Sequence, residues 1–473
     1  MSRVTAQDFY DFHKCPHRVF LNRSGNPKEK LPLSEFLNLL FERALVHEQE
    51  VIKDLPHVTP EGKTLEEQAA STIKLMEAGA ERIFQGVLLF SEDSGKPDLL
   101  ERVAGKSKFG DYFYKPVDIK SGSGFEDEEK GKLREDYGLQ LFHYGALLAR
   151  IQATFPPDGE ILNKRKERVI YRLDEFAVLY AATLPEVRAL ATGAKSDEPA
   201  LCSDCKFCQW WGHCEKVLVA ANDVSLLPDV GRSKKLGLNA AGVKAIPDIP
   251  RFDFAAVKIK GIGPKTVDSI TRSAEVTLSG KPLVLGKPAL PDTRVRVYLD
   301  FEDDPTQELI YLCGVWIEPA LRGLNYHGLF CTDEAGEAKV WGGLQKLCSE
   351  VQREDYVVFH YSQYERTKIG SLERKYGVVE KDALELFKGR MIDLYPIVKQ
   401  SVVLPVRSYS IKQVSPFAGH RYSTEGASGA QSIVWFQEYQ EDESKGDVFE
   451  KLLTYNREDC LALKAVEGWL RGL

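Results

Sequence analysis

The sequence predicts a mixed α/β protein that folds as two or three domains. Three observations lead to this expectation. The chain has 473 residues, more than one ordinary hydrophobic core organises. Its 43% hydrophobic and 28% charged residues are typical of a globular protein. Helix-like and strand-like runs occur on both sides of a segment that is broken by glycine and proline.

Residues 1–220 are expected to contain both helices and strands. Thr5 followed by Asp8 predicts a capped helix start, and apolar residues at helical spacing predict a helix over residues 33–52. Strand-like runs come next, at residues 86–90, 98–100 and 112–119. A further helix is expected over residues 134–150. The order is therefore helix, strands, helix.

Residues 221–285 are expected to form short helices broken by glycine and proline, and residues 280–288 read as an extended linker. A domain boundary is expected near residue 290. Beyond it, two apolar runs predict neighbouring strands and the rest predicts helices; the strands lie at residues 295–300 and 309–316. No repeat of fixed period is visible. The predicted domains are residues 1–220, 221–285 and 290–473.

The net charge of −7 provides no global basic field. Any nucleic-acid contact must therefore rest on local patches or on metal ions held between carboxylates. No apolar run approaches membrane-spanning length, and the first residues lack the apolar stretch of a secretory signal. We expect a cytoplasmic protein without membrane contact.

Cysteines crowd into one short segment, at Cys202, Cys205, Cys208 and Cys214. The last three are separated by two and then five residues, so a tight turn can aim their thiolates at one point. Cys15 is a candidate fourth ligand because it begins the domain that the three cysteines end. The alternative is a local zinc site made by the four crowded cysteines, with His213 in reserve. The residues alone leave iron–sulfur and zinc open.

A first set of polar residues points to phosphodiester chemistry. Alternation along the predicted strand puts Asp118 and Lys120 on one face. Asp98 and Asp118 would hold Mg²⁺ or Mn²⁺, and Lys120 would position a water molecule or stabilise the transition state. An Asp-x-Lys sequence on a strand is common, however, and its structural alternative is a half-exposed strand with solvated charges.

Three further residues extend this set. Gln140 and Tyr144 lie one helical turn apart, so both can face the same groove. His47, on the helix predicted upstream, could add a metal ligand.

In this order, and bracketed by Cys15 and the group Cys205, Cys208 and Cys214, the set resembles the RecB-type branch of the PD-(D/E)xK nucleases. The likeness is greatest to the iron–sulfur members, which include bacterial helicase-nucleases and the exonucleases of CRISPR adaptation. It covers about the first 220 residues. It implies a PD-(D/E)xK core that cleaves single-stranded DNA and is closed by a structural 4Fe-4S cluster on those four cysteines. Cys202 lies outside the pattern and is interpreted as a spare thiol.

The segment Ile259 to Val267 resembles a helix-hairpin-helix motif. Its glycines allow a tight turn, and the following helix would begin at Pro264 or Lys265. Free N–H groups there can meet a phosphate without reading sequence. The alternative is a helical linker whose glycines only turn the chain.

A second set of carboxylates follows the predicted boundary. Asp300 and Glu302 share one strand face, and Tyr455 and Asp459 lie one helical turn apart. Together with Glu365 they resemble the DEDDy 3'–5' exonucleases of the RNase H-like fold, over residues 293–473. Glu365 stands where that family has aspartate, so the second metal is expected to be shifted or weakly held. Asp393 is a candidate supporting carboxylate, with a helix cap or a surface residue as the alternatives.

The complete order resembles a family of RecB-like nucleases, some of which are fused to a superfamily I helicase. The chain has no phosphate-cradling Gly-x-x-x-x-Gly-Lys-Ser/Thr motif, so a helicase would have to be a separate partner. We expect a metal-dependent deoxyribonuclease that trims single-stranded DNA in repair, recombination or defence. Two alternatives stay open: a non-catalytic DNA-binding scaffold that recruits a helicase, and an exonuclease directed at RNA.

Overall fold

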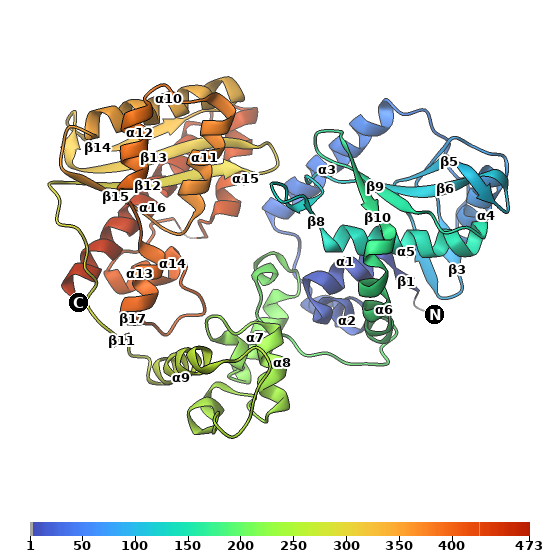
Figure 1. Cartoon of the computed structure of the whole chain (residues 1–473), viewed down its shortest axis with the longest axis horizontal. Coiled ribbons are helices and arrows are strands. Elements are labelled where there is room, and N and C mark those ends of the chain that lie inside the picture. The colour runs from blue at the N-terminus through green and yellow to red at the C-terminus, as the bar shows by residue number, and fades with distance from the viewer. Residues whose placement is uncertain (1–2, 425) are drawn as a thin grey trace. The chain divides into compact units, whose positions relative to one another are not determined.

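The computed structural model describes residues 3–424 and 426–473 and divides the chain into two compact units, Met1–Val217 and Leu218–Leu473. The division falls close to the boundary expected at residue 220. The middle segment and the C-terminal region belong to one unit. Both units combine helices with strands (Figure 1). Within the described residues, no helix has the length and apolar character needed to cross a membrane.

A five-stranded sheet organises the first unit, with strand order β10-β9-β6-β5-β2. The strands are β2 (Arg82–Phe84), β5 (Leu99–Ser107), β6 (Gly110–Ile119), β9 (Asp158–Leu162) and β10 (Arg168–Arg172). Strands β5 and β6 are antiparallel, whereas β6 and β9 are parallel and need a crossover. The long helix α5 (Glu135–Gln152) is that crossover, and it buries Leu141 and Leu148 in the core with Tyr114 of the sheet.

The first helix begins as predicted. The Thr5 hydroxyl accepts from the Asp8 N–H (3.3 Å), and the Asp8 carboxylate accepts from the Thr5 N–H (2.8 Å), which completes a capping box. The other strands and α-helices that begin in this unit are β1 (Val4–Thr5), α1 (Ala6–Lys14), α2 (Pro16–Ser24), α3 (Glu35–Lys53), α4 (Leu65–Glu77), β3 (Leu88–Phe90), β4 (Asp93–Gly95), β7 (Phe125–Asp127), β8 (Lys132–Leu133), α6 (Ala177–Ala191) and α7 (Trp211–Ala220).

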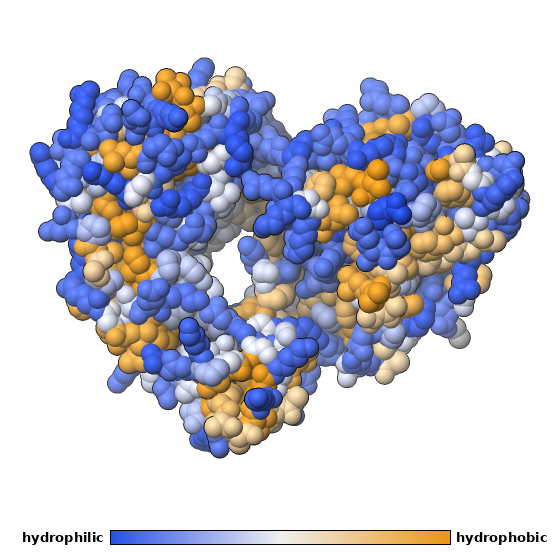
Figure 2. Space-filling view, in the orientation of Figure 1, coloured by the Kyte–Doolittle hydropathy of each residue, from blue (hydrophilic) through white to orange (hydrophobic). Residues whose placement is uncertain are grey.

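Helix α3 buries little of its apolar surface. Val51 and Ile52 are its buried residues, whereas Phe41, Leu45 and Val46 are 55%, 58% and 54% exposed. Elsewhere, the face of the molecule in Figure 2 is mostly hydrophilic, with apolar residues in separate patches. Phe41, Leu45 and Val46 therefore leave an apolar surface of α3 exposed.

The middle segment makes the same turn twice, before α8 (Arg232–Ala240) and before α9 (Pro264–Ser279). Gly231 and Gly263 precede the two helices with similar backbone angles (φ −77°, ψ 179° and φ −93°, ψ 175°). Two positions earlier, Asp229 and Gly261 have φ of 63° and 78°. The turn predicted at residues 259–267 is thus one of a pair.

The hydrogen bonds of the two turns also correspond. The Val230 N–H donates to the Leu227 carbonyl (3.2 Å), as the Ile262 N–H does to the Ile259 carbonyl (3.1 Å). The middle segment therefore uses one local turn conformation twice. The two turns share a glycine and a few apolar positions, too few to produce a visible period in the sequence.

A second five-stranded sheet, with order β14-β13-β12-β15-β16, organises the C-terminal region. Strands β12 to β14 are antiparallel neighbours, β15 pairs with β12 in parallel, and β16 pairs with β15 in parallel. The strands are β12 (Val295–Asp304), β13 (Leu309–Leu321), β14 (Leu324–Phe330), β15 (Tyr356–His360) and β16 (Met391–Asp393). The helices are α10 (Glu334–Val351), α11 (Tyr364–Tyr376), α12 (Lys381–Gly389), α13 (Leu394–Ser401), α14 (Ile411–Val414), α15 (Gly429–Glu441) and α16 (Gly446–Gly472).

Two expectations for this region were incomplete. Strands continue after residue 316, and β15 is buried along its whole length, so its apolar run has no strand-like alternation. The expected linker at residues 280–288 contains β11 (Leu283–Val284), which pairs with β17 (Val402–Val403). This pairing attaches the linker to the C-terminal region.

Candidate functional site

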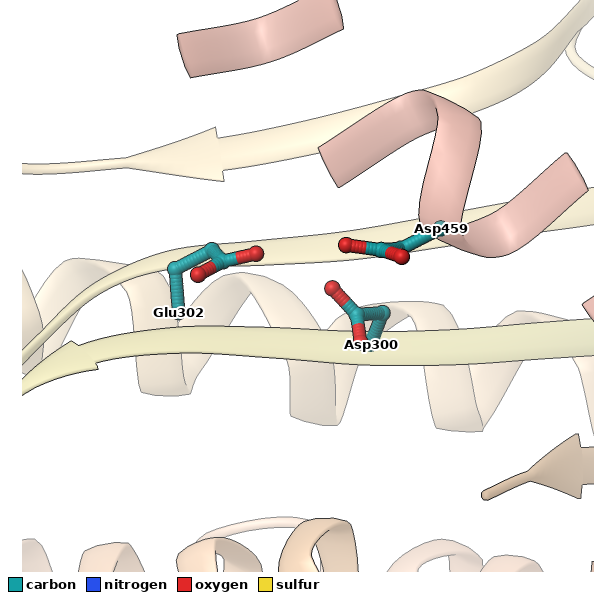
Figure 3. Close-up of side chains that lie close together, drawn as sticks. All are labelled: Asp300, Glu302 and Asp459. Atoms are coloured by element: carbon teal, nitrogen blue, oxygen red, sulfur yellow. The ribbon is translucent and has the colours of Figure 1, made fainter. Parts of the chain in front are cut away.

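Three carboxylates converge in the C-terminal region, from Asp300 and Glu302 of β12 and Asp459 of α16 (Figure 3). One ligand oxygen from each lies within 4.8 Å of the others. Strand alternation explains why Asp300 and Glu302 face the same helix. Within residues 3–424 and 426–473, this is the one set of three or more His, Cys, Asp or Glu ligand atoms that meets this distance.

The triad is electrostatically strained without a cation. Burial first, and then the neighbouring carboxylates, raise the pKa of Asp300 and of Glu302 well above their usual values. Burial also raises the pKa of Asp459. Oxygen ligands of this kind suit Mg²⁺ or Mn²⁺, whose charge would offset the repulsion. The donor set therefore fits a divalent metal ion.

Neighbouring amides and hydroxyls hold the triad in place. Asn456 donates its amide N–H to Asp300 (2.7 Å) and accepts from the Tyr326 hydroxyl (2.8 Å). Gly314 lies opposite Asp300 on β13, and a Cβ at this glycine would lie 1.7 Å from the Asn456 amide oxygen. A residue without a side chain at position 314 is therefore needed for the bond between Asn456 and Asp300.

Tyr455, predicted to orient water, contacts two charged groups of the centre. Its hydroxyl interacts with Asp459 and accepts a hydrogen bond from Lys412 Nζ (2.7 Å). Tyr422 donates a further hydrogen bond to Asp459. Sequence reasoning did not identify Lys412 or Tyr422. Lys412 lies in the four-residue helix α14, which is too short to show a helical period, and Tyr422 lies in the segment between α14 and α15.

Glu365 lies at the start of α11, outside the compact triad. It is buried, and its Oε2 is 3.3 Å from Nδ1 of the fully buried His360. Its charge still contributes to the raised pKa of Asp300, after those of Asp459 and Glu302. Asp393 caps α13 by accepting from the Tyr395 N–H (2.9 Å), and it also accepts from the Ser362 N–H (2.8 Å).

In the first unit, Asp98, Asp118 and Lys120 lie together where β5 and β6 pair. The Asp98 carboxylate accepts from the Ile119 N–H (2.7 Å), and Asp118 accepts from the Asp98 N–H (3.2 Å). Lys120 Nζ is 2.9 Å from Asp118 Oδ2. Burial and the adjacent Asp118 raise the pKa of Asp98 to about 7, against the opposing effect of Lys120. Two adjacent carboxylates and one lysine thus share a small site.

Of the other residues predicted for this site, Tyr144 lies near the two carboxylates, whereas His47 interacts elsewhere. Tyr144 is buried near Asp98 and Asp118, whose charges add to the effect of burial in raising its pKa. His47 instead interacts with the backbone of Asn163. One position along α3, Glu48 adds its charge to those that raise the pKa of Asp98. The sequence prediction overlooked Glu48, although it lies next to His47 on the same helix.

A groove of about 470 Å³ in the first unit includes Lys120 and Gln140. The amide oxygen of Gln140 is buried there without a hydrogen-bond partner among the described residues. Three further cations line the groove, Lys14, Arg18 and Lys30, together with the aromatic side chains Tyr10, Phe36, Phe41, Tyr137, Phe207 and Trp210. Cations interleaved with aromatic rings suit a single nucleic-acid strand, whose bases stack while its phosphates are neutralised.

Five cysteines line one pocket of the first unit: Cys15, Cys202, Cys205, Cys208 and Cys214. Cys15 joins α1 to α2, Cys205 and Cys208 lie in and directly after the short turn Ser203–Phe207, and Cys214 lies in the first turn of α7. The sulfur atoms of Cys202 and Cys205 are 3.6 Å apart. Cys202, interpreted from the sequence as a spare thiol, interacts with both Cys15 and Cys205. The sulfurs do not form a group of three within 4.8 Å among the described residues.

Comparison with known proteins identifies one region of the chain. A family model described as the RNase_H superfamily matches residues 297–471. No curated protein matches the chain. The matched residues contain the triad, and nucleases of this kind use divalent metal ions, in agreement with the ligands that converge there. The C-terminal region of this protein is therefore an RNase H-like domain.

Proposed function

We propose that the protein is a metal-dependent nuclease with two centres, acting on DNA and preferentially on single strands. The observation that carries the proposal is the convergence of Asp300, Glu302 and Asp459 within an RNase H-like domain. Such carboxylates are the ligands that two-metal phosphodiester hydrolysis requires.

In the RNase H-like domain, Asp300, Glu302 and Asp459 would hold the metal. A divalent ion there supplies charge neutralisation and an acidified water molecule. Tyr455 orients water through its hydroxyl, which lies between Lys412 and Asp459. Asn456 keeps Asp300 in its ligand orientation. This arrangement supports 3'–5' exonuclease chemistry of the DEDDy type.

In the first unit, a PD-(D/E)xK centre is supported by the order of its elements and by its charges. Asp98 directly precedes β5, Asp118 lies on the paired strand β6, and Lys120 neutralises Asp118. We assign Asp98 and Asp118 as metal ligands, with Glu48 or His47 as further candidates from α3. Lys120 and Gln140 face the groove, where a phosphate can approach both.

The lining of the groove supports a single strand as the substrate. A duplex keeps its bases stacked inside, whereas a single strand can place them on aromatic side chains such as Tyr10, Phe36 and Trp210. The nearby cations would neutralise phosphates despite the net charge of −7. A paired assay with DNA and RNA oligonucleotides of equal sequence tests the preference, because faster cleavage of RNA would favour the RNA-directed alternative.

We further propose that Cys15, Cys205, Cys208 and Cys214 hold a structural 4Fe-4S cluster, and the pocket that they line supports this assignment. Cys202 lines the same pocket and is a fifth candidate ligand. Zinc held by Cys202, Cys205, Cys208 and Cys214 is the alternative. Anaerobically purified protein should be brown and contain iron and acid-labile sulfide. Colourless protein that contains zinc and no iron would contradict the cluster.

The paired turns of the middle segment support binding of the nucleic-acid backbone in a helix-hairpin-helix manner. We propose that this segment presents DNA to a nuclease centre, in a cytoplasmic protein that works in repair, recombination or defence. A helicase partner would supply the single strand.

The proposal for the RNase H-like centre is tested by Asp300→Ala combined with Asp459→Ala. We expect this variant to lose Mn²⁺ binding at the triad and the cleavage that depends on it. Unchanged Mn²⁺-dependent trimming of a labelled strand would show that the centre does not act. DNA binding without cleavage under any divalent ion would favour the non-catalytic scaffold.

A further inference from the structure

Lys412 lies beside the triad of the RNase H-like domain but is held by neutral groups. Its Nζ donates to the Ala427 carbonyl (2.8 Å) and to the Tyr455 hydroxyl (2.7 Å). The same ammonium lies 4.2 Å from the ring centroid of Tyr455 and 5.1 Å from that of Tyr422. Two hydrogen bonds and two aromatic faces therefore fix its position.

The charge of Lys412 acts on the whole triad. Burial lowers the pKa of Lys412, while Asp459, Glu302 and Asp300 oppose this effect, in that order. Glu365 Oε2 lies 3.3 Å from Nδ1 of His360, outside the triad. The centre thus combines three convergent carboxylates with a neighbouring ammonium group.

We propose that Lys412 is a positioning residue of this centre, which holds the Tyr455 hydroxyl in place and adds a fixed positive charge beside Asp300, Glu302 and Asp459. The proposal rests on the proposed nuclease function of the domain. The fixed charge stabilises negative charge that develops on the phosphate during cleavage. The same charge weakens the attraction of the carboxylates for a divalent cation.

The charge of Lys412 should therefore favour cleavage and disfavour metal binding. A purely structural role of Lys412 would instead affect both in the same direction. If Lys412 only satisfied the Ala427 carbonyl and packed against the tyrosines, its removal would disturb the triad and weaken metal binding and cleavage together. If its charge acts as proposed, its removal strengthens metal binding and slows cleavage.

The test uses the full chain with Asp118→Ala and Lys120→Ala, so that the first centre is silent. Lys412→Met removes the charge and keeps the length of the side chain, and Lys412→Arg keeps the charge. Lys464→Met is the matched control, because Lys464 also lies over an aromatic ring, that of Trp316 (5.6 Å), and pairs with Glu318. Mn²⁺ affinity is measured by electron paramagnetic resonance, and kcat and KM are measured on a labelled single strand.

We expect Lys412→Met to bind Mn²⁺ about tenfold more tightly and to lower kcat roughly 100-fold, with KM changed little. Lys412→Arg should recover most of the missing kcat, and Lys464→Met should match the parent in both measurements. Tyr455→Phe combined with Lys412→Met should lose less activity than the product of the two single losses, because one residue acts partly through the other.

A parallel loss of Mn²⁺ affinity and kcat in Lys412→Met, or an unchanged kcat, would overturn the proposal. If this variant does not fold, Lys412→Gln retains a donor for the Ala427 carbonyl, and the same two outcomes apply to it. Failure of the proposed function has a different signature. In that case the parent protein itself would show no Mn²⁺ site that Asp300→Ala with Asp459→Ala removes.

Discussion

At the scale of single residues, both centres are built from carboxylates whose charges are unfavourable in the absence of metal. Asp98 is next to Asp118, and Asp300 is next to Glu302 and Asp459. Burial raises the pKa of Asp98, Asp300 and Glu302. The protein therefore gives up some stability to keep these groups together, and metal binding would recover it.

Asp98 gives a prediction on pH and stability. Its pKa is about 7 in the folded protein, against about 3.9 for an unfolded chain. Between about pH 3.9 and about pH 7 the folded protein binds a proton at Asp98 that the unfolded chain has released. In the absence of metal, Asp98 therefore lowers the free energy of unfolding as the pH rises, by up to about 1.4 kcal/mol per pH unit, and this decrease ends above about pH 7. Asp98→Asn should remove this contribution.

Thermal unfolding in EDTA and in Mn²⁺ checks this prediction. In EDTA at pH 8, Asp98→Asn should melt above the parent protein, and the difference should shrink towards pH 4. In Mn²⁺ at pH 8, the parent should gain stability that the variant lacks. Equal melting curves at every pH would contradict the assignment of Asp98.

Gly314 gives a prediction on packing. Gly314→Ala would push the Asn456 amide away from Asp300, so we expect a decrease of roughly 1–3 kcal/mol in unfolding free energy together with lower activity. Gly342, on α10, has open space around the same added carbon. Gly342→Ala should therefore be neutral or slightly stabilising. Denaturant unfolding and cleavage assays compare the two variants, and equal effects would refute the proposed clash with Asn456.

At the scale of helices and strands, local sequence patterns predicted several elements correctly. The capping box of Thr5 and Asp8, the helix expected over residues 33–52 and the strands that carry Asp118 and Asp300 all follow from residue spacing. Each of these features depends on residues that are near one another in the chain.

Features set by tertiary packing were harder to predict. The buried strand β15 lacks alternation, and β11 depends on pairing with a distant strand. Lys412 reaches the triad from the short helix α14, and Tyr422 reaches it from the segment that follows this helix. Glu48 and His47 are neighbours on α3, and only the orientation of this helix in the folded protein decides which of them affects Asp98. The sequence thus predicted the carboxylates of the candidate sites and neighbours such as Lys120 and Tyr455, but not the contacts made by Lys412, Tyr422 and Glu48.

The paired turns give a prediction at this scale. Lys234 lies near the start of α8 and Lys265 near the start of α9, so each follows one of the paired turns. Lys234→Glu combined with Lys265→Glu should weaken binding of single-stranded DNA and reduce the slope of log affinity against log salt by about one for each phosphate that the protein no longer neutralises. Lys287→Glu, in the segment before β12, is the control. Fluorescence anisotropy in EDTA measures binding without cleavage. An unchanged slope would indicate that the turns serve only as a linker.

At the scale of the whole molecule, each of the two units carries its own candidate centre, and the groove and cysteine pocket belong to the first. The net charge of −7 leaves local cations and bound metal to attract nucleic acid. We therefore expect cleavage to depend on a divalent ion and to fall steeply with salt concentration.

We expect both units to cut nucleic acid. The most direct test is cleavage of an end-labelled single-stranded DNA in Mn²⁺ by the intact protein, by Asp118→Ala with Lys120→Ala, and by Asp300→Ala with Asp459→Ala. We predict that each double variant retains part of the activity with a changed product pattern, and that combining all four substitutions abolishes cleavage. Metal-dependent cleavage that survives all four substitutions, or an intact protein that binds the strand without cutting it, would contradict the claim.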